Sequence, residues 1–299
     1  MSGNSTPRGR SNDETARHAA ANPAILETPP IAPHGESLVL FTEIGNAQLL
    51  RCLVAIKSLH AQLGRGRVAL LDDGTLTGAD RAVLAHHCGD PEIIAPADTG
   101  PGWRALETLL KRRGSAYWLW LSGDSVTIGP VPEIEQAIAI NASFLLPLEG
   151  SANHPEPLSD FARAAFPDGP VSGEVMARLE SRLARIDRPG WRYVQSDAGL
   201  MGFAAGGPGI RFAAACRAEL EELIGADDVN GPEAAQVAAS LLLASESRTV
   251  LLPQERYRHG GATGWNDGTS FLHFSGGDRH AGEHYAQASQ IAIEALRSR

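Results

Sequence analysis

Two segments of the chain hold residues whose types and spacing could bind a charged ligand. In LWLSGDSVTIGPV, an apolar run stops at one carboxylate, Asp124. A carboxylate at the end of a buried strand costs free energy unless a metal ion, an arginine or backbone amides pair with it. In SFLHFSGGDR, the spacing is His273-x-x-Gly276-x-x-Arg279. Because imidazole is a good ligand for divalent metals and guanidinium clamps phosphate oxygens, these residues together predict a site for a metal-bound diphosphate.

The elements that must position these residues alternate between strands and helices. Apolar runs predict strands at 37–41, 67–71, 92–94, 117–121, 142–146, 194–203, 249–252 and 270–274. Helical spacing and end signals predict helices at 49–59, 78–87, 103–113, 131–140, 158–166, 171–186, 210–224, 233–244 and 283–299. This rhythm predicts an α/β fold with a mostly parallel central sheet and helices on both faces. Ligands of such sheets bind beyond the carboxyl ends of the strands, and Asp124 lies just past one.

The chain is predicted to have one folded domain. Residues 1–36 are rich in Ser, Asn, Pro, Gly, Arg and Ala, so we expect a disordered N-terminal tail there. Residues 37–299 form the predicted folded domain, which ends in an Ala-rich helix at 283–299. Residues 150–190 break the strand–helix rhythm and lie between two segments that hold candidate site residues.

Four segments occur in the order WLWLSGDSVTIGPV, YVQSDAGLMGF, GPEAAQVAASLLL and LHFSGGDR. In this order they resemble the retaining GT-A glycosyltransferases of the family 8-like type, which includes glycogenin and bacterial galactosyltransferases. Taken in that order, the four segments look like that family's Asp-x-Asp strand, its Asn-Ala-Gly segment, the acidic start of the helix that follows, and its His-x-x-Gly-x-x-Lys motif. The resemblance covers roughly residues 37–280 and implies the GT-A fold.

The resemblance also implies roles for individual residues. It implies that Asp124 and His273 bind the metal, and that Asp197 and Glu233 orient the sugar hydroxyls or the acceptor. The residues implied for the nucleotide sugar are Phe41, Thr42, Asp72 (with Asp73 as the alternative), Arg104, Ser122, Gly276 and Arg279.

The chain departs from the family pattern in ways that affect the site. Ser122 stands where the first Asp of Asp-x-Asp is expected, so the metal site should be weakened. Arg279 replaces a lysine and keeps its positive charge, and the Lys-Pro-Trp tail that usually follows is absent. Asp197 puts an acid in place of an amide, so recognition of donor or acceptor is expected to differ.

The activity that the resemblance implies is transfer of a sugar, with retention, from a nucleoside diphosphate sugar to an acceptor hydroxyl. UDP is the default nucleotide, and the cofactor is a divalent metal, Mn²⁺ or Mg²⁺. One alternative is a degenerate relative that binds a nucleotide or a partner without transfer. A second is a Rossmann-type oxidoreductase, but the loop after the first strand, Thr42 to Asn46, lacks Gly-x-Gly-x-x-Gly.

Composition limits the classes of partner. A net charge of -9 argues against a nucleic-acid surface. No apolar run approaches the roughly 18 residues of a membrane span, and the N-terminus lacks a signal-peptide core, so the expected location is cytoplasmic. Cys52, Cys88 and Cys216 are far apart and are interpreted as small buried hydrophobic residues. The sequence leaves the sugar, the acceptor and the oligomeric state open.

Overall fold

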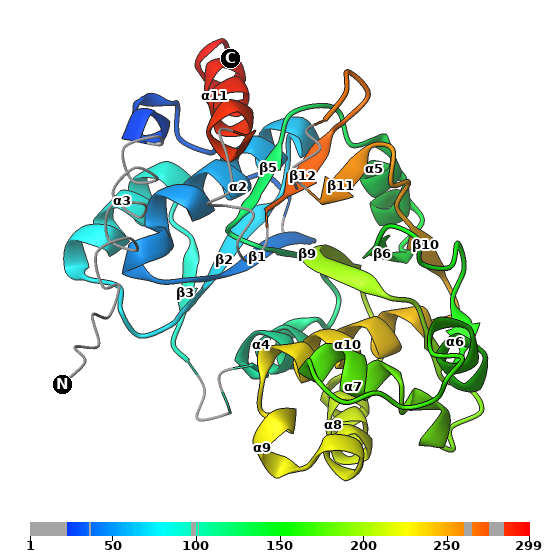
Figure 1. Cartoon of the computed structure of the whole chain (residues 1–299). Coiled ribbons are helices and arrows are strands. Elements are labelled where there is room, and N and C mark those ends of the chain that lie inside the picture. Colours follow the sequence, from blue (N-terminus) through cyan, green and yellow to red (C-terminus); the bar gives the residue numbers. More distant parts are fainter. Residues whose placement is uncertain (1–22, 36, 97–99, 101, 260–264, 275–283) are drawn as a thin grey trace, which may run out of the picture.

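The chain folds around a seven-stranded sheet with the strand order β10-β6-β9-β4-β1-β2-β3 (Figure 1). The structure is a computed structural model that describes residues 23–35, 37–96, 100, 102–259, 265–274 and 284–299. The strands are β1 Leu38–Ile44, β2 Arg67–Asp72, β3 Glu92–Ile94, β4 Tyr117–Leu121, β6 Ser143–Pro147, β9 Ser196–Phe203 and β10 Thr249–Leu251. All of these pairs are parallel except those of β9, so the predicted mostly parallel sheet is confirmed.

The antiparallel strand β9 determines which residues meet at the edge of the sheet. It pairs with β4 through Leu121↔Leu200 and with β6 through Pro147↔Ser196. The beginning of β9 therefore lies beside the carboxyl ends of β4 and β6. This is the edge at which ligands bind in parallel sheets, and β9 brings its own first residues to it.

A second, smaller sheet extends from this edge. Its strands are β5 Ser125–Thr127, β11 Tyr257–His259 and β12 Phe271–His273, in the order β11-β12-β5. The turn Ser122–Asp124 leads directly from β4 into β5, so the two sheets are joined at that turn. The register places His273 beside Ser125 on one side and beside His259 on the other.

Helices cover both faces of the large sheet, as the sequence predicts (Figure 1). One face carries α2 Leu49–Leu63, α3 Gly78–Cys88, α5 Pro132–Ala139 and α11 His284–Arg297. The other carries α4 Arg104–Arg112, α6 Leu158–Ala165, α7 Val175–Glu180, α8 Ile210–Ile224, α9 Ala226–Val229 and α10 Pro232–Ala244. Among the described residues no helix is both long enough and apolar enough to span a bilayer.

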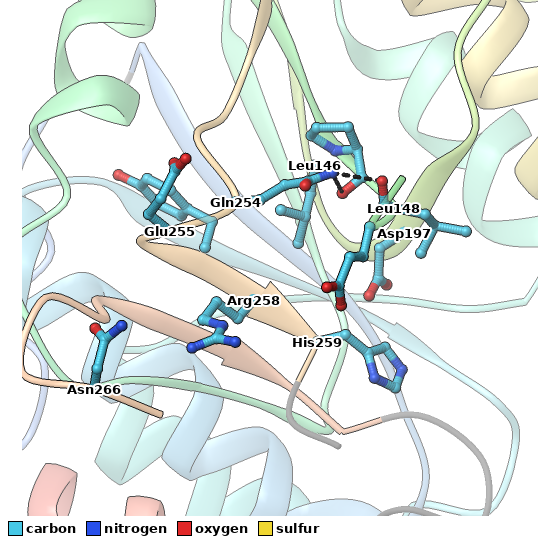
Figure 2. Close-up of a pocket in the computed structure, with 11 residues that line it drawn as sticks. Leu146, Leu148, Asp197, Gln254, Glu255, Arg258, His259 and Asn266 are labelled. Carbon is cyan, nitrogen blue, oxygen red and sulfur yellow. Dashed lines mark hydrogen bonds between the residues drawn. The ribbon is translucent and has the colours of Figure 1, made fainter. Parts of the chain in front are cut away.

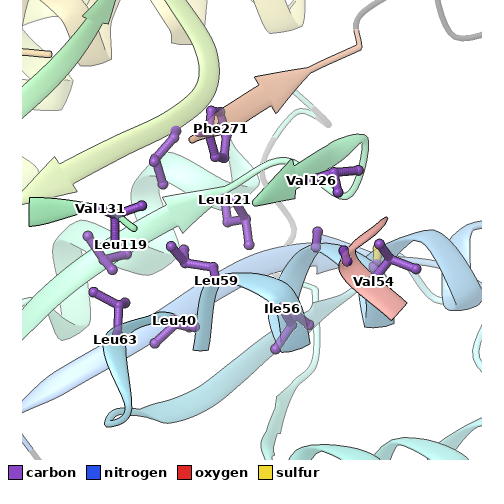
Figure 3. Close-up of a cluster of buried hydrophobic side chains, with 14 of the residues drawn as sticks. Leu40, Val54, Ile56, Leu59, Leu63, Leu119, Leu121, Val126, Val131 and Phe271 are labelled. Carbon is purple, nitrogen blue, oxygen red and sulfur yellow. The ribbon is translucent and has the colours of Figure 1, made fainter. Parts of the chain in front are cut away.

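Alternation along the strands sends side chains into two separate cores. In β1, Leu38 and Leu40 join the core under α2, whereas Val39 and Phe41 join the core under α4. Period-two alternation is what a strand buried on both faces requires. Figure 3 shows the first core, in which Leu59 of α2 packs near Leu119 and Leu121 of β4.

The predicted elements and the observed ones agree closely in position. The predicted 171–186 helix is the main exception: it is divided into α7 and the 3-10 helix η3 Leu183–Arg185. The short strands β7 Glu156–Pro157, β8 Arg192–Tyr193, β5 and β11 are not among the predicted strands. These strands have two or three residues each, which is too short for an alternating pattern to be recognised.

The predicted N-terminal tail is wrong for residues 23–35. A 3-10 helix, η1 Pro23–Glu27, buries Ile25 completely against the core under α2. The Lys57 ammonium, itself buried, donates to the carbonyl oxygen of Thr28 at 3.2 Å and lies 3.2 Å from His87 Nδ1. The mostly polar composition of the segment gave no indication that Ile25 and Ile31 are buried in the core. Residues 1–22 lie outside the described residues.

Replacing Lys57 with Met should change how stability depends on pH. Burial lowers the pKa of Lys57 to about 8, against about 10.4 in an unfolded chain. Between these values the unfolded chain binds more protons, so the contribution of Lys57 to the free energy of unfolding rises with pH. We therefore expect wild type to gain stability relative to Lys57→Met between about pH 7.5 and 9.5 in urea unfolding. Parallel pH profiles for the two proteins would contradict this assignment.

Candidate functional site

Asp124 lies in the tight turn that joins the two sheets. The Ser122 backbone N–H donates to the Gly199 carbonyl at 2.9 Å, and the Asp124 N–H donates to Ser122 Oγ at 3.2 Å. The Asp124 carboxylate forms an ion pair with Arg51 of α2, with 2.8 Å between Nη1 and Oδ1. The buried strand β4 can thus end at a carboxylate because an arginine from the neighbouring helix neutralises it.

A second group of polar side chains lies at the beginning of β9. Asp197 Oδ1 is 2.5 Å from His273 Nδ1, and both side chains are less than one-tenth exposed. His259, exposed at the end of β11, is the register partner of His273. One ligand atom from each of Asp197, His259 and His273 can be chosen so that all three lie within 4.8 Å of one another. A carboxylate and two imidazoles at this separation could hold one metal ion.

The hydrogen bonds of this cluster leave two buried atoms unsatisfied. Asp197 Oδ1 accepts from the Gly199 N–H at 2.7 Å. Asp197 Oδ2 and His273 Nδ1 make no hydrogen bond, although both are buried. Burial raises the pKa of Asp197, but His273, the Gly199 amide and His259 outweigh that effect, so its pKa lies below the ordinary value. An ionised carboxylate and an unprotonated imidazole nitrogen are the states in which these groups bind metals.

Gly199 makes room for the histidine. A Cβ atom at this position would lie 2.3 Å from His273 Cγ and 2.5 Å from His273 Cβ. Separations below 3 Å cannot be tolerated, so His273 can approach Asp197 only because residue 199 has no side chain. This gives a physical reason for the glycine in the segment SDAGLMGF.

Two pockets open at this edge of the sheet. The first, here the β4 pocket, has a volume of about 380 Å³ and is lined by Thr42, Glu43, Gln48, Asp73, Arg104, Trp120, Leu121, Ser122, Gly123, Asp124 and Ala198. The second, here the β6 pocket, has a volume of about 310 Å³ and is lined by residues 146–149, Asp197, 254, 255, 257–259 and 266. Figure 2 shows Asp197 and His259 at one end of the β6 pocket and Asn266 at the other. Adjacent residues of β9 line the two pockets: Asp197 lines the β6 pocket and Ala198 the β4 pocket.

Charged groups are paired across the β4 pocket. Arg104 Nη2 of α4 lies 3.4 Å from Glu43 Oε1 at the end of β1. Burial raises the pKa of Glu43, Arg104 lowers it, and nearby Asp73 raises it, with a net upward shift. Two guanidinium groups, those of Arg51 and Arg104, therefore lie around one pocket, each beside a carboxylate.

The structure brings some of the predicted nucleotide residues together. Thr42, Arg104 and Ser122 all line the β4 pocket. Phe41 does not: its side chain is fully buried and packs edge-on against Trp118, with 5.6 Å between ring centroids. The sequence could not assign Phe41 to a face, because every residue of this strand up to Thr42 is buried.

Asp72 and Glu233 also lie away from the described pocket linings. Asp72 Oδ1 accepts from the Gly74 N–H at 2.8 Å, and the carboxylate forms an ion pair with Arg81, so Asp72 stabilises the turn after β2. Its alternative, Asp73, lines the β4 pocket. Glu233 is half-buried in the first turn of α10. Gly276 and Arg279 lie outside the described residues.

Sequence reasoning missed Arg51 and His259. Arg51 occurs within the helical segment LLRCLVAIK, whose pattern is typical of a buried helix. Its role, the ion pair with Asp124, is seen only in the structure. His259 belongs to a three-residue strand, and its closeness to His273 results from strand pairing. The only local sequence feature that could have pointed to His259 is the pair of glycines directly after it.

Gly199→Ala should displace His273 and destabilise the protein. Overpacking of this kind typically costs about 1–3 kcal/mol in the free energy of unfolding, measured with urea. Gly190→Ala is the matched control, because a Cβ atom there would meet nothing within 4 Å. Equal stability of the two variants would show that His273 does not occupy the position described.

Comparisons with known proteins support the architecture. No protein-family model and no curated protein sequence matches the chain. Among solved structures, an active-site mutant of LgtC has a TM-score of 0.50 at 12% identity, over 85% of this chain and 95% of that one. The galactosyltransferase LgtC in complex with donor and acceptor sugar analogues gives 0.49 at 12%, with the same coverage. The bifunctional glycosyltransferase WbbM gives 0.48 at 12%, over 90% of this chain and 53% of that one.

These identities are too low to assign a family or an activity, but the likeness to LgtC extends over nearly the whole of both chains. The chain therefore has the GT-A fold of nucleotide-sugar glycosyltransferases.

Proposed function

We propose that the protein is a glycosyltransferase that moves a sugar, with retention, from a UDP-sugar to an acceptor hydroxyl. The main support is that adjacent residues of β9, Asp197 and Ala198, line two pockets on the carboxyl edge of a GT-A sheet. A transferase must hold two substrates so that the reacting atoms meet, and two pockets lined from the same end of one strand suit that requirement.

In this proposal the β4 pocket binds the nucleoside diphosphate. Thr42, Gln48 and Asp73 offer hydrogen-bonding groups at the ends of β1 and β2. Arg104 offers a guanidinium, which can form two parallel hydrogen bonds to phosphate oxygens. Its present partner is the Glu43 carboxylate, 3.4 Å away, which the diphosphate would displace. Arg279 keeps its proposed role at the diphosphate.

The negative charge that develops on the leaving diphosphate must be stabilised within the site. A bound divalent metal, Mn²⁺ or Mg²⁺, would supply positive charge as a Lewis acid. Arg104 would hold the phosphates from the β4 side, while Ser122 Oγ remains fixed by the Asp124 N–H. Donors fixed before the reaction stabilise developing charge without a cost of reorganisation.

The β6 pocket is the proposed acceptor side. Its lining is polar, with Glu149, Gln254, Glu255, Arg258 and Asn266 around it, as recognition of sugar hydroxyls requires. Residues 150–190, which begin beside Glu149, are proposed to extend this side. Glu233 keeps a proposed role in orienting the acceptor, because α10 also fixes the start of β9: Gln236 Nε2 donates to the Ser196 carbonyl at 2.7 Å.

A second candidate function is nucleotide binding without transfer. Ser122 removes one acid from the expected Asp-x-Asp pair, and Arg51 already neutralises the other, Asp124. Binding and turnover separate the two candidates. For a Rossmann-type oxidoreductase, the loop after β1 offers no glycine-rich phosphate turn and enters η2 Asn46–Gln48 and α2 instead.

Release of UDP from UDP-sugars tests the transferase directly. We expect the purified protein with Mn²⁺ to hydrolyse at least one common UDP-sugar slowly and to transfer faster when a suitable acceptor is added. A coupled assay for UDP over a panel of sugars measures this. UDP binding without turnover of any donor on the panel would favour the degenerate alternative.

Arg104→Ala should weaken UDP binding, measured by titration calorimetry with Mn²⁺ and again with EDTA. Loss of a charge-assisted hydrogen bond costs about 1.5–3 kcal/mol, so the expected rise in Kd is roughly 10- to 100-fold. Arg112→Ala is the control, because Arg112 belongs to the same helix but pairs with Glu92 outside the pocket. Similar affinities for the two variants would place the diphosphate elsewhere.

A further inference from the structure

We propose that the metal centre has moved away from the end of β4, and that Asp197, His259 and His273 bind a divalent transition-metal ion. Of the pair first expected to hold the metal, Asp124 and His273, only His273 remains a ligand. The inference deepens the proposed function by naming the residues and the class of metal. It can still be tested without any nucleotide or sugar.

The first step concerns Asp124. Its carboxylate is 2.8 Å from the Arg51 guanidinium, and both side chains are about four-fifths buried. To bind a cation, Asp124 would have to give up an ion pair in a partly buried place, and Arg51 would then repel the ion. Ser122 cannot replace the missing carboxylate, because its hydroxyl accepts from the Asp124 N–H and is a neutral, weak ligand.

The second step concerns the three proposed ligands, which come from three strands. Strand pairing places His259 beside His273, and the rings are 5.9 Å apart between centroids at an angle of 80°. Asp197 approaches the same point from β9, where Gly199 leaves space for the His273 ring. No single segment contains the site, so it depends on the junction of β9 with the smaller sheet.

The third step is the unsatisfied chemistry of the cluster. Buried polar atoms are almost always paired, yet Asp197 Oδ2 and His273 Nδ1 lack hydrogen bonds. Asp197 Oδ1 and His273 Nδ1 lie 2.5 Å apart as an ion pair, a place where a proton or a metal ion can hold the two groups together. A metal ion in place of that proton would move the two groups slightly apart and bind both, and His259, exposed at the pocket, would complete the set.

The fourth step is the choice of metal. Two imidazoles and one carboxylate favour Mn²⁺, Co²⁺ or Zn²⁺ over Mg²⁺, which prefers oxygen ligands and retains its water. Three protein ligands leave coordination positions for substrate oxygens. Asp197 and His259 line the β6 pocket, so the ion would face that pocket.

Titration of the protein alone with Co²⁺, by calorimetry, tests the ligand set. We expect one Co²⁺ per chain, and His259→Ala to raise its Kd at least 10- to 100-fold, since removal even of groups behind the ligands costs about that much. Asp124→Asn should leave the Kd for Co²⁺ almost unchanged. His273→Ala does not discriminate, because His273 is a ligand in both arrangements.

His154→Ala is the control for adventitious binding, because His154 is exposed and distant in the sequence from the cluster. The buried cysteines Cys52, Cys88 and Cys216 do not compete for the ion. Thermal unfolding provides a second measurement: Co²⁺ should raise the Tm of wild type and of Asp124→Asn, but not of His259→Ala.

Two results would overturn the inference. One is loss of Co²⁺ binding in Asp124→Asn together with its retention in His259→Ala, which would restore the metal to the end of β4. The other is failure of wild type to bind Co²⁺, Mn²⁺ and Zn²⁺. Co²⁺ binding through His259 without turnover of any UDP-sugar would support this site while counting against the proposed transferase.

Discussion

The candidate site depends on the antiparallel insertion of β9 between β4 and β6. In a fully parallel sheet every strand would end at the carboxyl edge, and only final strand residues and the loops after them could supply side chains there. Because β9 runs the other way, its first residues belong to the sheet and lie at that same edge. Asp197 is thus placed by strand hydrogen bonds rather than by a loop. A site on a regular element holds its geometry more closely than one on a loop.

Two contacts of Gly199 link β9 to the other parts of the site. Its carbonyl accepts from the Ser122 N–H and from Ser125 Oγ, which ties β9 to the turn that contains Asp124. Its missing side chain admits His273. One residue therefore sets how closely β9 approaches both the Ser122–Asp124 turn and His273. Movement of this strand would alter the linings of the β4 and β6 pockets and the contact between Asp197 and His273 together.

Charge pairing explains how a chain of net charge -9 can hold partly buried guanidinium groups at this edge of the sheet. Arg51 and Arg104 are each held beside a carboxylate, Asp124 and Glu43 respectively. Such pairs keep partly buried guanidinium groups in place when the pocket is empty. The net charge of the chain therefore does not reveal these positive groups. Their positions are seen only in the three-dimensional structure.

The sequence by itself determined most of the architecture. Apolar runs located every strand of the large sheet, and helical spacing, together with end signals such as the Thr77 cap, located the main helices. These patterns are local: the burial of a strand or helix face is recorded within a few neighbouring residues. The resemblance of four segments to GT-A glycosyltransferases implied Thr42, Arg104 and Ser122, which line one pocket, and Asp197 and His273, which lie side by side.

Only the tertiary structure decided which partners the charged groups have. The sequence could not show that Arg51 neutralises Asp124, that Phe41 turns into the core, or that His259 stands beside His273. Nor could it show that residues 23–35 pack against α2. The physical reason is that each of these contacts joins segments far apart in the chain, or depends on which face of a doubly buried strand a residue occupies. Strand order and register set such contacts, and no local pattern of residues encodes them.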